Sequence, residues 1–182
     1  MTDFAHYAPG PANAQVVKDG EQKWTLVLVR ELRHSPEKVW QALIDPAQLR
    51  EWAPFVTDGS LGAVGAVNLT WVGNPNPIAT KITRVEPPKA LEYGDMKWDL
   101  APLGMGTRLT LWAKIDRRFI SMGAAGWHIS FDVLDYLLSG TPLGRIAGAD
   151  AMKFAGWQRL NAEYAEQFGI KAPNWPPKAA EK

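Results

Sequence analysis

Three residues with acid–base side chains, His128, Asp132 and Asp135, lie at positions i, i+4 and i+7 of one stretch of the chain. In a helix this spacing places the three side chains on one stripe. One hypothesis is that Asp132 orients His128 as a general base beside a cavity. The interpretation that we favour is a solvated helix face, on which Asp132 supports His128 through helical pairing. We therefore predict no catalytic residue here.

Other sets of reactive residues fit known chemistries less well. Ser130 cannot join His128 and Asp132 in a catalytic triad, because residues two apart on a helix point to different sides. A metal site would need a further ligand beyond one imidazole and two carboxylates, and the sequence marks none. The glycine-rich stretch 140–148 lacks the Lys-Ser/Thr ending of a phosphate-binding loop. We expect neither a metal nor a cofactor.

The elements that must position these residues begin with the stretch 124–138. Its apolar residues recur at steps of three and four, which predicts one amphipathic helix, and Gly140 and Pro142 follow as stop signals. The apolar residues of this stripe are Ala124, Trp127, Phe131, Leu134 and Leu138. A similar pattern predicts a last helix over 149–169.

The rest of the chain is typical of an antiparallel sheet. Residues 23–33 and 107–115 alternate between apolar and polar side chains, as strands with one buried face do. Further strand-like segments (61–72, 78–86, 91–93 and 96–100) are separated by turns, and two short helices are predicted after Ser35-Pro36 and Asp45-Pro46. These elements predict an α+β fold in which a curved antiparallel sheet is closed by the 124–138 helix.

The domain prediction is a single folded unit with two tails. Residues 1–22 are expected to form an irregular extension, 23–169 the domain and 170–182 a flexible tail. Trp112 falls on the charged face of its strand and should be partly exposed.

Composition excludes several function classes. The 182 residues carry a net charge of +1, so no global field attracts nucleic acid or an anionic membrane. The absence of cysteine excludes disulfides, thiolate metal sites and cysteine nucleophiles. The first residues lack the pattern of a signal peptide, and no apolar run approaches the roughly 20 residues that cross a bilayer. We expect a soluble, cytoplasmic protein.

Apolar side chains are the better candidates for a binding site. Large rings and aliphatic residues project from elements that should surround one interior, and a hydroxyl such as that of Tyr93 could orient a ligand there. The alternative is that these side chains interdigitate and leave no void. The predicted ligand-binding residues are Trp52, Phe55, Trp71, Ile82, Tyr93, Trp98, Leu109, Leu111, Trp127, His128 and Phe131.

Several segments resemble a known family in their order along the chain. The segment Arg30–Trp52 is similar to the opening signature of the Hsp90 ATPase activator homologue family, and 85–93, 106–111 and 126–135 fit its later segments. That family belongs to the SRPBCC superfamily, also called START-like or Bet v 1-like. The resemblance covers about 23–169 and implies the helix-grip fold, with an apolar cavity between a curved sheet and its C-terminal helix.

The resemblance also implies a range of functions, which fold alone does not decide. Members of the superfamily bind lipids, hormones and polyketides, a few act as cyclases, and a related eukaryotic domain stimulates a chaperone ATPase. We expect this protein to bind a small hydrophobic ligand without established catalysis. The alternatives are a protein-interaction module that acts on a chaperone and a cyclase-like enzyme for a polyketide or aromatic substrate. Monomer and homodimer both remain open.

Overall fold

A computed structural model describes residues 6–173 of the chain and shows one sheet, a long helix and four shorter helices in that range. The strands are β1 (Gln15–Val17), β2 (Lys23–Leu32), β3 (Phe55–Thr57), β4 (Gly65–Trp71), β5 (Ile78–Glu86), β6 (Ala90–Tyr93), β7 (Met96–Leu103) and β8 (Gly106–Asp116). The helices are α1 (Pro36–Ile44), α2 (Pro46–Trp52), α3 (Ile120–Leu138), α4 (Gly148–Met152) and α5 (Ala155–Phe168).

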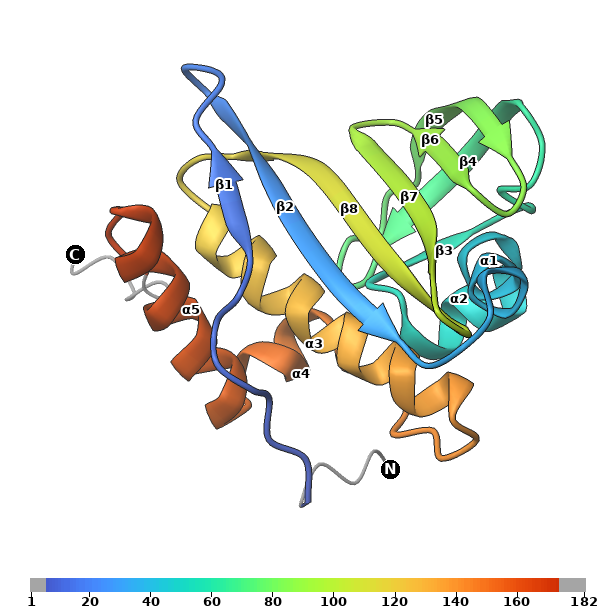
Figure 1. The fold of residues 1–182 in the computed structure, drawn as a ribbon. Coiled ribbons are helices and arrows are strands. Elements are labelled where there is room, and N and C mark those ends of the chain that lie inside the picture. The colour runs from blue at the N-terminus through green and yellow to red at the C-terminus, as the bar shows by residue number, and fades with distance from the viewer. Residues whose placement is uncertain (1–5, 174–182) are drawn as a thin grey trace.

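The sheet is antiparallel throughout and curves around α3 (Figure 1). Its strand order is β1-β2-β8-β7-β6-β5-β4-β3. The neighbours β2 and β8 are therefore far apart in the sequence, whereas β3 to β8 follow one another in both sequence and space. The long helix α3 lies against the concave side, with α5 beside it. This arrangement confirms the predicted α+β class and the helix-grip architecture.

Strands β2 and β8 are the two longest strands of the sheet and pair with each other. They pair from Lys23 with Asp116 to Leu32 with Thr107. The leucines on their concave face, among them Leu28 and Leu111, are fully buried. Every second residue of these strands thus points to the concave face, and together these side chains form an apolar surface that α3 covers.

The two short helices begin at the predicted caps. The Ser35 hydroxyl accepts a hydrogen bond from the Lys38 amide at 3.3 Å, and the Asp45 carboxylate accepts one from the Ala47 amide at 3.0 Å. In each helix a proline occupies the first position, where no amide donor is needed. The two helices place Trp52 in the core, where its indole N–H donates to the Ala42 carbonyl.

Several element boundaries differ from those predicted. Helix α3 begins at Ile120, about one turn earlier than expected, and the predicted last helix is divided into α4 and α5. The division occurs because Phe154 has an extended backbone (φ −80°, ψ 128°), which apolar spacing does not reveal. The short strands β1 and β3 were not predicted, since three residues are too few for an alternation to be recognised.

The segment before β2 is held on α5, although it was predicted to be irregular. The backbone amides of Asn13 and Ala14 donate to the Tyr164 hydroxyl at 3.1 and 3.2 Å, and the Ala12 amide donates to Glu163 at 3.1 Å. Strand β1 then pairs with β2. The predicted tail beyond residue 173 lies outside the described residues.

The Tyr164 hydroxyl should therefore contribute strongly to stability. Tyr164→Phe would leave the backbone amides of Asn13 and Ala14 and the ring nitrogen of His128 without their shared partner. We expect the free energy of unfolding to fall by about 2–4 kcal/mol, measured by urea denaturation. The control is Tyr136→Phe, because the Tyr136 side chain is 41% exposed and should change stability by less than about 0.5 kcal/mol. Equal effects in the two variants would contradict this account.

Candidate ligand-binding cavity

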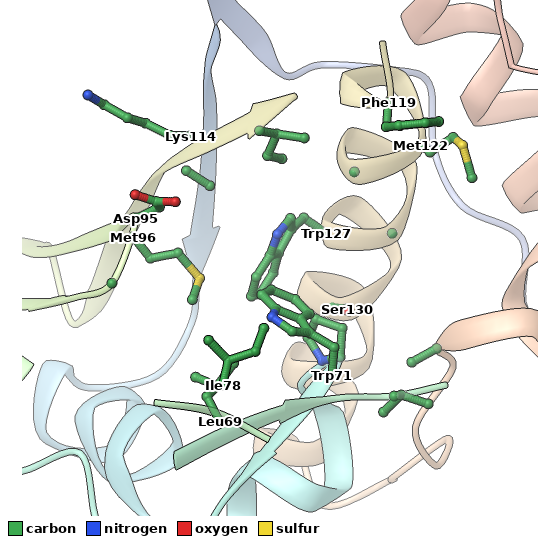
Figure 2. Close-up of a pocket in the computed structure, with 18 of the residues that line it drawn as sticks. Leu69, Trp71, Ile78, Asp95, Met96, Lys114, Phe119, Met122, Trp127 and Ser130 are labelled. Atoms are coloured by element: carbon green, nitrogen blue, oxygen red, sulfur yellow. The ribbon is translucent and has the colours of Figure 1, made fainter. Parts of the chain in front are cut away.

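A cavity of about 740 Å³ lies between the sheet and the first half of α3 (Figure 2). One wall is formed by Leu69, Trp71 and Ile78 of β4 and β5, and another by Met96 at the start of β7. The cavity is thus bounded mainly by apolar side chains.

Helix α3 presents one continuous stripe to the cavity. The lining residues follow at steps of three, one, three, one and three, which places them on one side over roughly 16 Å of helix. They are Phe119, Met122, Gly123, Gly126, Trp127 and Ser130. Gly126 faces open space, since a Cβ atom built on it would meet no atom within 4 Å. The absence of a side chain at this position helps to keep the cavity open.

The segment that leads into α4 covers another side of the cavity. Ile146, Ala151 and Trp157 line the cavity and are buried. Gly148 has a positive φ of 66°, and a Cβ there would lie 3.0 Å from a methyl carbon of Val72. Glycine therefore allows this segment to approach the end of β4 closely.

Beside the cavity the structure has a solid aromatic core. The Trp127 ring lies within 6.5 Å, centroid to centroid, of the rings of Trp52, Trp71, Trp98, Phe55 and Phe131. Most of these contacts are edge-to-face, the geometry that aromatic pairs prefer. Trp127 itself is 4% exposed. It belongs to the core on one side and lines the cavity on the other.

The predicted ligand-binding residues are divided between the cavity and this core. Trp71 and Trp127 line the cavity. The others do not line it; they are Trp52, Phe55, Ile82, Tyr93, Trp98, Leu109, Leu111, His128 and Phe131, and all are buried. The Tyr93 hydroxyl is engaged, because it accepts a hydrogen bond from the Trp98 indole at 3.0 Å. Burial raises the pKa of this phenol.

His128 is not solvated, contrary to the interpretation that we favoured, although its helical pairing with Asp132 is present at 3.9 Å. His128 is 2% exposed, and its Nδ1 shares a hydrogen bond of 2.7 Å with the Tyr164 hydroxyl of α5. Asp132 accepts hydrogen bonds from Arg30 of β2 and from Tyr7. His128 is buried because α5 and the N-terminal segment cover this side of α3. His128 does not line the cavity either, so it is not positioned to act on a ligand there.

The signal for this buried network was present in the sequence. Arg30 occupies the same face of β2 as the buried residues Leu26, Leu28 and Leu32. A guanidinium on an apolar strand face requires a carboxylate partner. Asp132 supplies that partner from the facing helix. Sequence reasoning overlooked the conflict between the charge of Arg30 and its position.

Charged groups line one exposed edge of the cavity, which we call its mouth; Asp95 and Lys114 lie there (Figure 2). Lys23 and Asp95 form an ion pair of 2.9 Å there, and Asp116 pairs with Arg118 at 2.7 Å. Arg118 holds the pKa of Asp116 down at about 2. Across residues 6–173 no cluster of three or more acidic or histidine side chains could hold a metal ion.

Trp112 lies on the convex face of the sheet, as predicted, and is partly exposed. The ammonium group of Lys97 stands 5.1 Å from the centroid of its ring. This distance is typical of a cation–π contact. No helix within the described part of the chain is long and apolar enough to cross a bilayer.

Comparison with protein families agrees with this architecture. Residues 23–155 match the family model described as polyketide cyclase / dehydrase and lipid transport. The chain belongs to this family. The family match supports the SRPBCC superfamily and does not single out the Hsp90 ATPase activator homologues that the sequence resembles. A comparison with curated protein sequences finds no match.

Solved structures share the fold of this polyketide cyclase / dehydrase family member at low sequence identity. A conserved protein of unknown function from Enterococcus faecalis is 17% identical, with a TM-score of 0.63 over 86% of this chain and 90% of that one. The protein CalU16 from Micromonospora echinospora is 21% identical, with a TM-score of 0.57 over 84% and 92%. A protein from Mesorhizobium loti is 26% identical, with a TM-score of 0.56 over 64% and 98%.

The buried position of His128 predicts a pH dependence of stability. Burial, partly offset by the nearby Asp132 carboxylate, lowers the pKa of this imidazole from 6.5 to about 4. The unfolded chain therefore takes up the proton more readily than the folded one. The contribution of neutral His128 to the free energy of unfolding is therefore fully present above pH 6.5. It is lost as the pH falls towards 4, by roughly 3 kcal/mol in total.

Urea unfolding between pH 7.5 and pH 4 measures this loss. We expect His128→Gln to have a flatter stability profile over that range, while His6→Gln, at an exposed histidine, should keep the wild-type profile. A wild-type profile in the His128 variant would show that another group is responsible.

Proposed function

We propose that this protein binds a small hydrophobic ligand in the cavity between the sheet and α3. The observation that supports the proposal is the cavity of about 740 Å³ itself, which falls within the range of about 300–1,000 Å³ that ligand sites occupy. The rings of Trp71 and Trp127 and the thioethers of Met96 and Met122 give it a largely apolar lining. Methionine side chains adapt to irregular shapes, so they suit a site that takes a bulky guest.

Binding is better supported than turnover. A cyclase-like reaction needs an acid or base within reach of the ligand. The histidine and tyrosine on which that hypothesis rests, His128 and Tyr93, hydrogen-bond Tyr164 and Trp98 in the core. The charged groups that line the cavity are exposed or partly exposed, and two of them, Lys23 and Asp95, are paired with each other. The proposed activity is therefore carriage or sequestration of the ligand.

The cavity can be filled without disturbing the core. Gly126→Leu would place a side chain in open space, whereas Gly126→Ala would add a single methyl group. We expect the leucine variant to bind the neutral fluorescent probe N-phenyl-1-naphthylamine at least about tenfold more weakly than the wild type, measured by fluorescence titration. The alanine variant should retain binding and gain up to about 1 kcal/mol of stability, since alanine favours a helix over glycine. Unchanged binding by the leucine variant would place the probe elsewhere.

Native mass spectrometry of the purified protein provides a test that requires no probe. A small molecule that co-purifies with the wild type and is absent from Gly126→Leu would support the proposed function. A wild-type mass equal to that of the bare chain, together with no probe binding, would contradict it.

A further inference from the structure

The inner end of the cavity carries a hydroxyl group that has no partner. Ser130 is 1% exposed and is the last residue of α3 that lines the cavity. Among residues 6–173 its Oγ has no hydrogen-bond partner. Figure 2 shows Ser130 farther along α3 than Phe119 and Trp127. An unpaired hydroxyl in such a place is unfavourable for the empty protein, so the group calls for an explanation.

Neighbouring hydroxyl groups on the same helix are satisfied. The Ser121 hydroxyl donates to the Asn161 side chain at 2.7 Å. The Ser139 hydroxyl lies 3.3 Å from Nε2 of His34. Two other buried polar atoms of the described chain lack partners, in Thr57 and Arg145, and neither residue lines the cavity. Ser130 thus combines burial, an unpaired hydroxyl and a place in the cavity wall.

We propose that Ser130 determines which ligand the cavity accepts, by hydrogen-bonding an uncharged oxygen at the ligand's inner end. A phenolic hydroxyl or a ring ketone on an apolar body would fit, and the oxygen-bearing end would enter first. This inference rests on the proposed ligand-binding function.

The positions of the charged side chains around the cavity indicate that the ligand oxygen beside Ser130 is uncharged. Every charged side chain that lines the cavity is exposed or partly exposed, whereas Ser130 is buried. These charged residues are Lys23, Lys81, Asp95, Lys114 and Asp116. A carboxylate beside Ser130 would be buried without a counterion, which is strongly unfavourable. A simple fatty acid would instead leave its carboxylate at the mouth and the Ser130 hydroxyl unpaired. Ser130 therefore selects against such a ligand.

The test compares two probes of nearly the same shape, 2-naphthol and 2-methylnaphthalene, which differ in a hydroxyl and a methyl group. Their dissociation constants are measured by displacement of N-phenyl-1-naphthylamine from the wild type and from Ser130→Ala. We expect the preference for 2-naphthol, expressed as the ratio of the two constants, to fall about tenfold in the variant. Ser121→Ala is the matched control on the same helix and should keep the wild-type ratio.

A second readout comes from the protein without ligand. Because Ser130→Ala removes an unpaired buried hydroxyl and inserts a strong helix former, its unfolding equilibrium constant should fall about threefold to tenfold. Ser121→Ala should change that constant in the opposite direction, since it leaves Asn161 without a partner. A destabilised Ser130→Ala would overturn the inference.

The failure of this inference is distinguishable from failure of the proposed function. If both naphthalenes bind and their ratio is the same in the wild type and in Ser130→Ala, the role of Ser130 is overturned while ligand binding stands. If neither compound binds the wild type, both proposals are overturned.

Discussion

The packing of the Trp127 ring is the contact on which the rest of the interior depends. It touches rings from α2, β3, β4, β7 and α3 itself, and so joins the helix to the β3–β4 end of the curved sheet and to β7 in its interior. Rings in such contact stabilise one another beyond the area that they bury. Because the opposite side of Trp127 lines the cavity, the same residue marks where close packing ends and open space begins. A rigid core next to a void allows the void to persist.

Two sides of helix α3 have different roles. Toward β4, β5 and the end of β8 it lines the cavity, with Gly126 leaving room for a guest. Toward α5 it holds a buried polar network in which His128 meets Tyr164 and Asp132 meets Arg30. The network fastens the N-terminal segment and α5 to the helix. It stabilises the fold at neutral pH and leaves the cavity free of titrating groups at its inner end.

The sequence predicted the architecture well because it depends on periodicity, which is local. Alternation in β2 and β8 and the capping residues Ser35 and Asp45 are confirmed in detail. The site was harder to predict, since whether a buried ring such as Trp98 faces a void or another ring depends on packing between distant elements. Ser130 escaped notice as a ligand contact for the same reason. His128 was placed in solvent because helical spacing does not reveal that α5 packs on that face.

The resulting account is of a family member in which a solid aromatic core supports a separate, largely apolar cavity. The central claim is that this cavity, and no other surface, is the ligand site. A crystal structure of the protein with 2-naphthol tests it most directly. The account predicts density for the naphthyl ring inside the cavity, against the cavity-facing sides of Trp71 and Trp127, with the ligand oxygen within hydrogen-bond distance of the Ser130 Oγ. A compound found on the outer surface, with the cavity closed by repacked side chains, would contradict it.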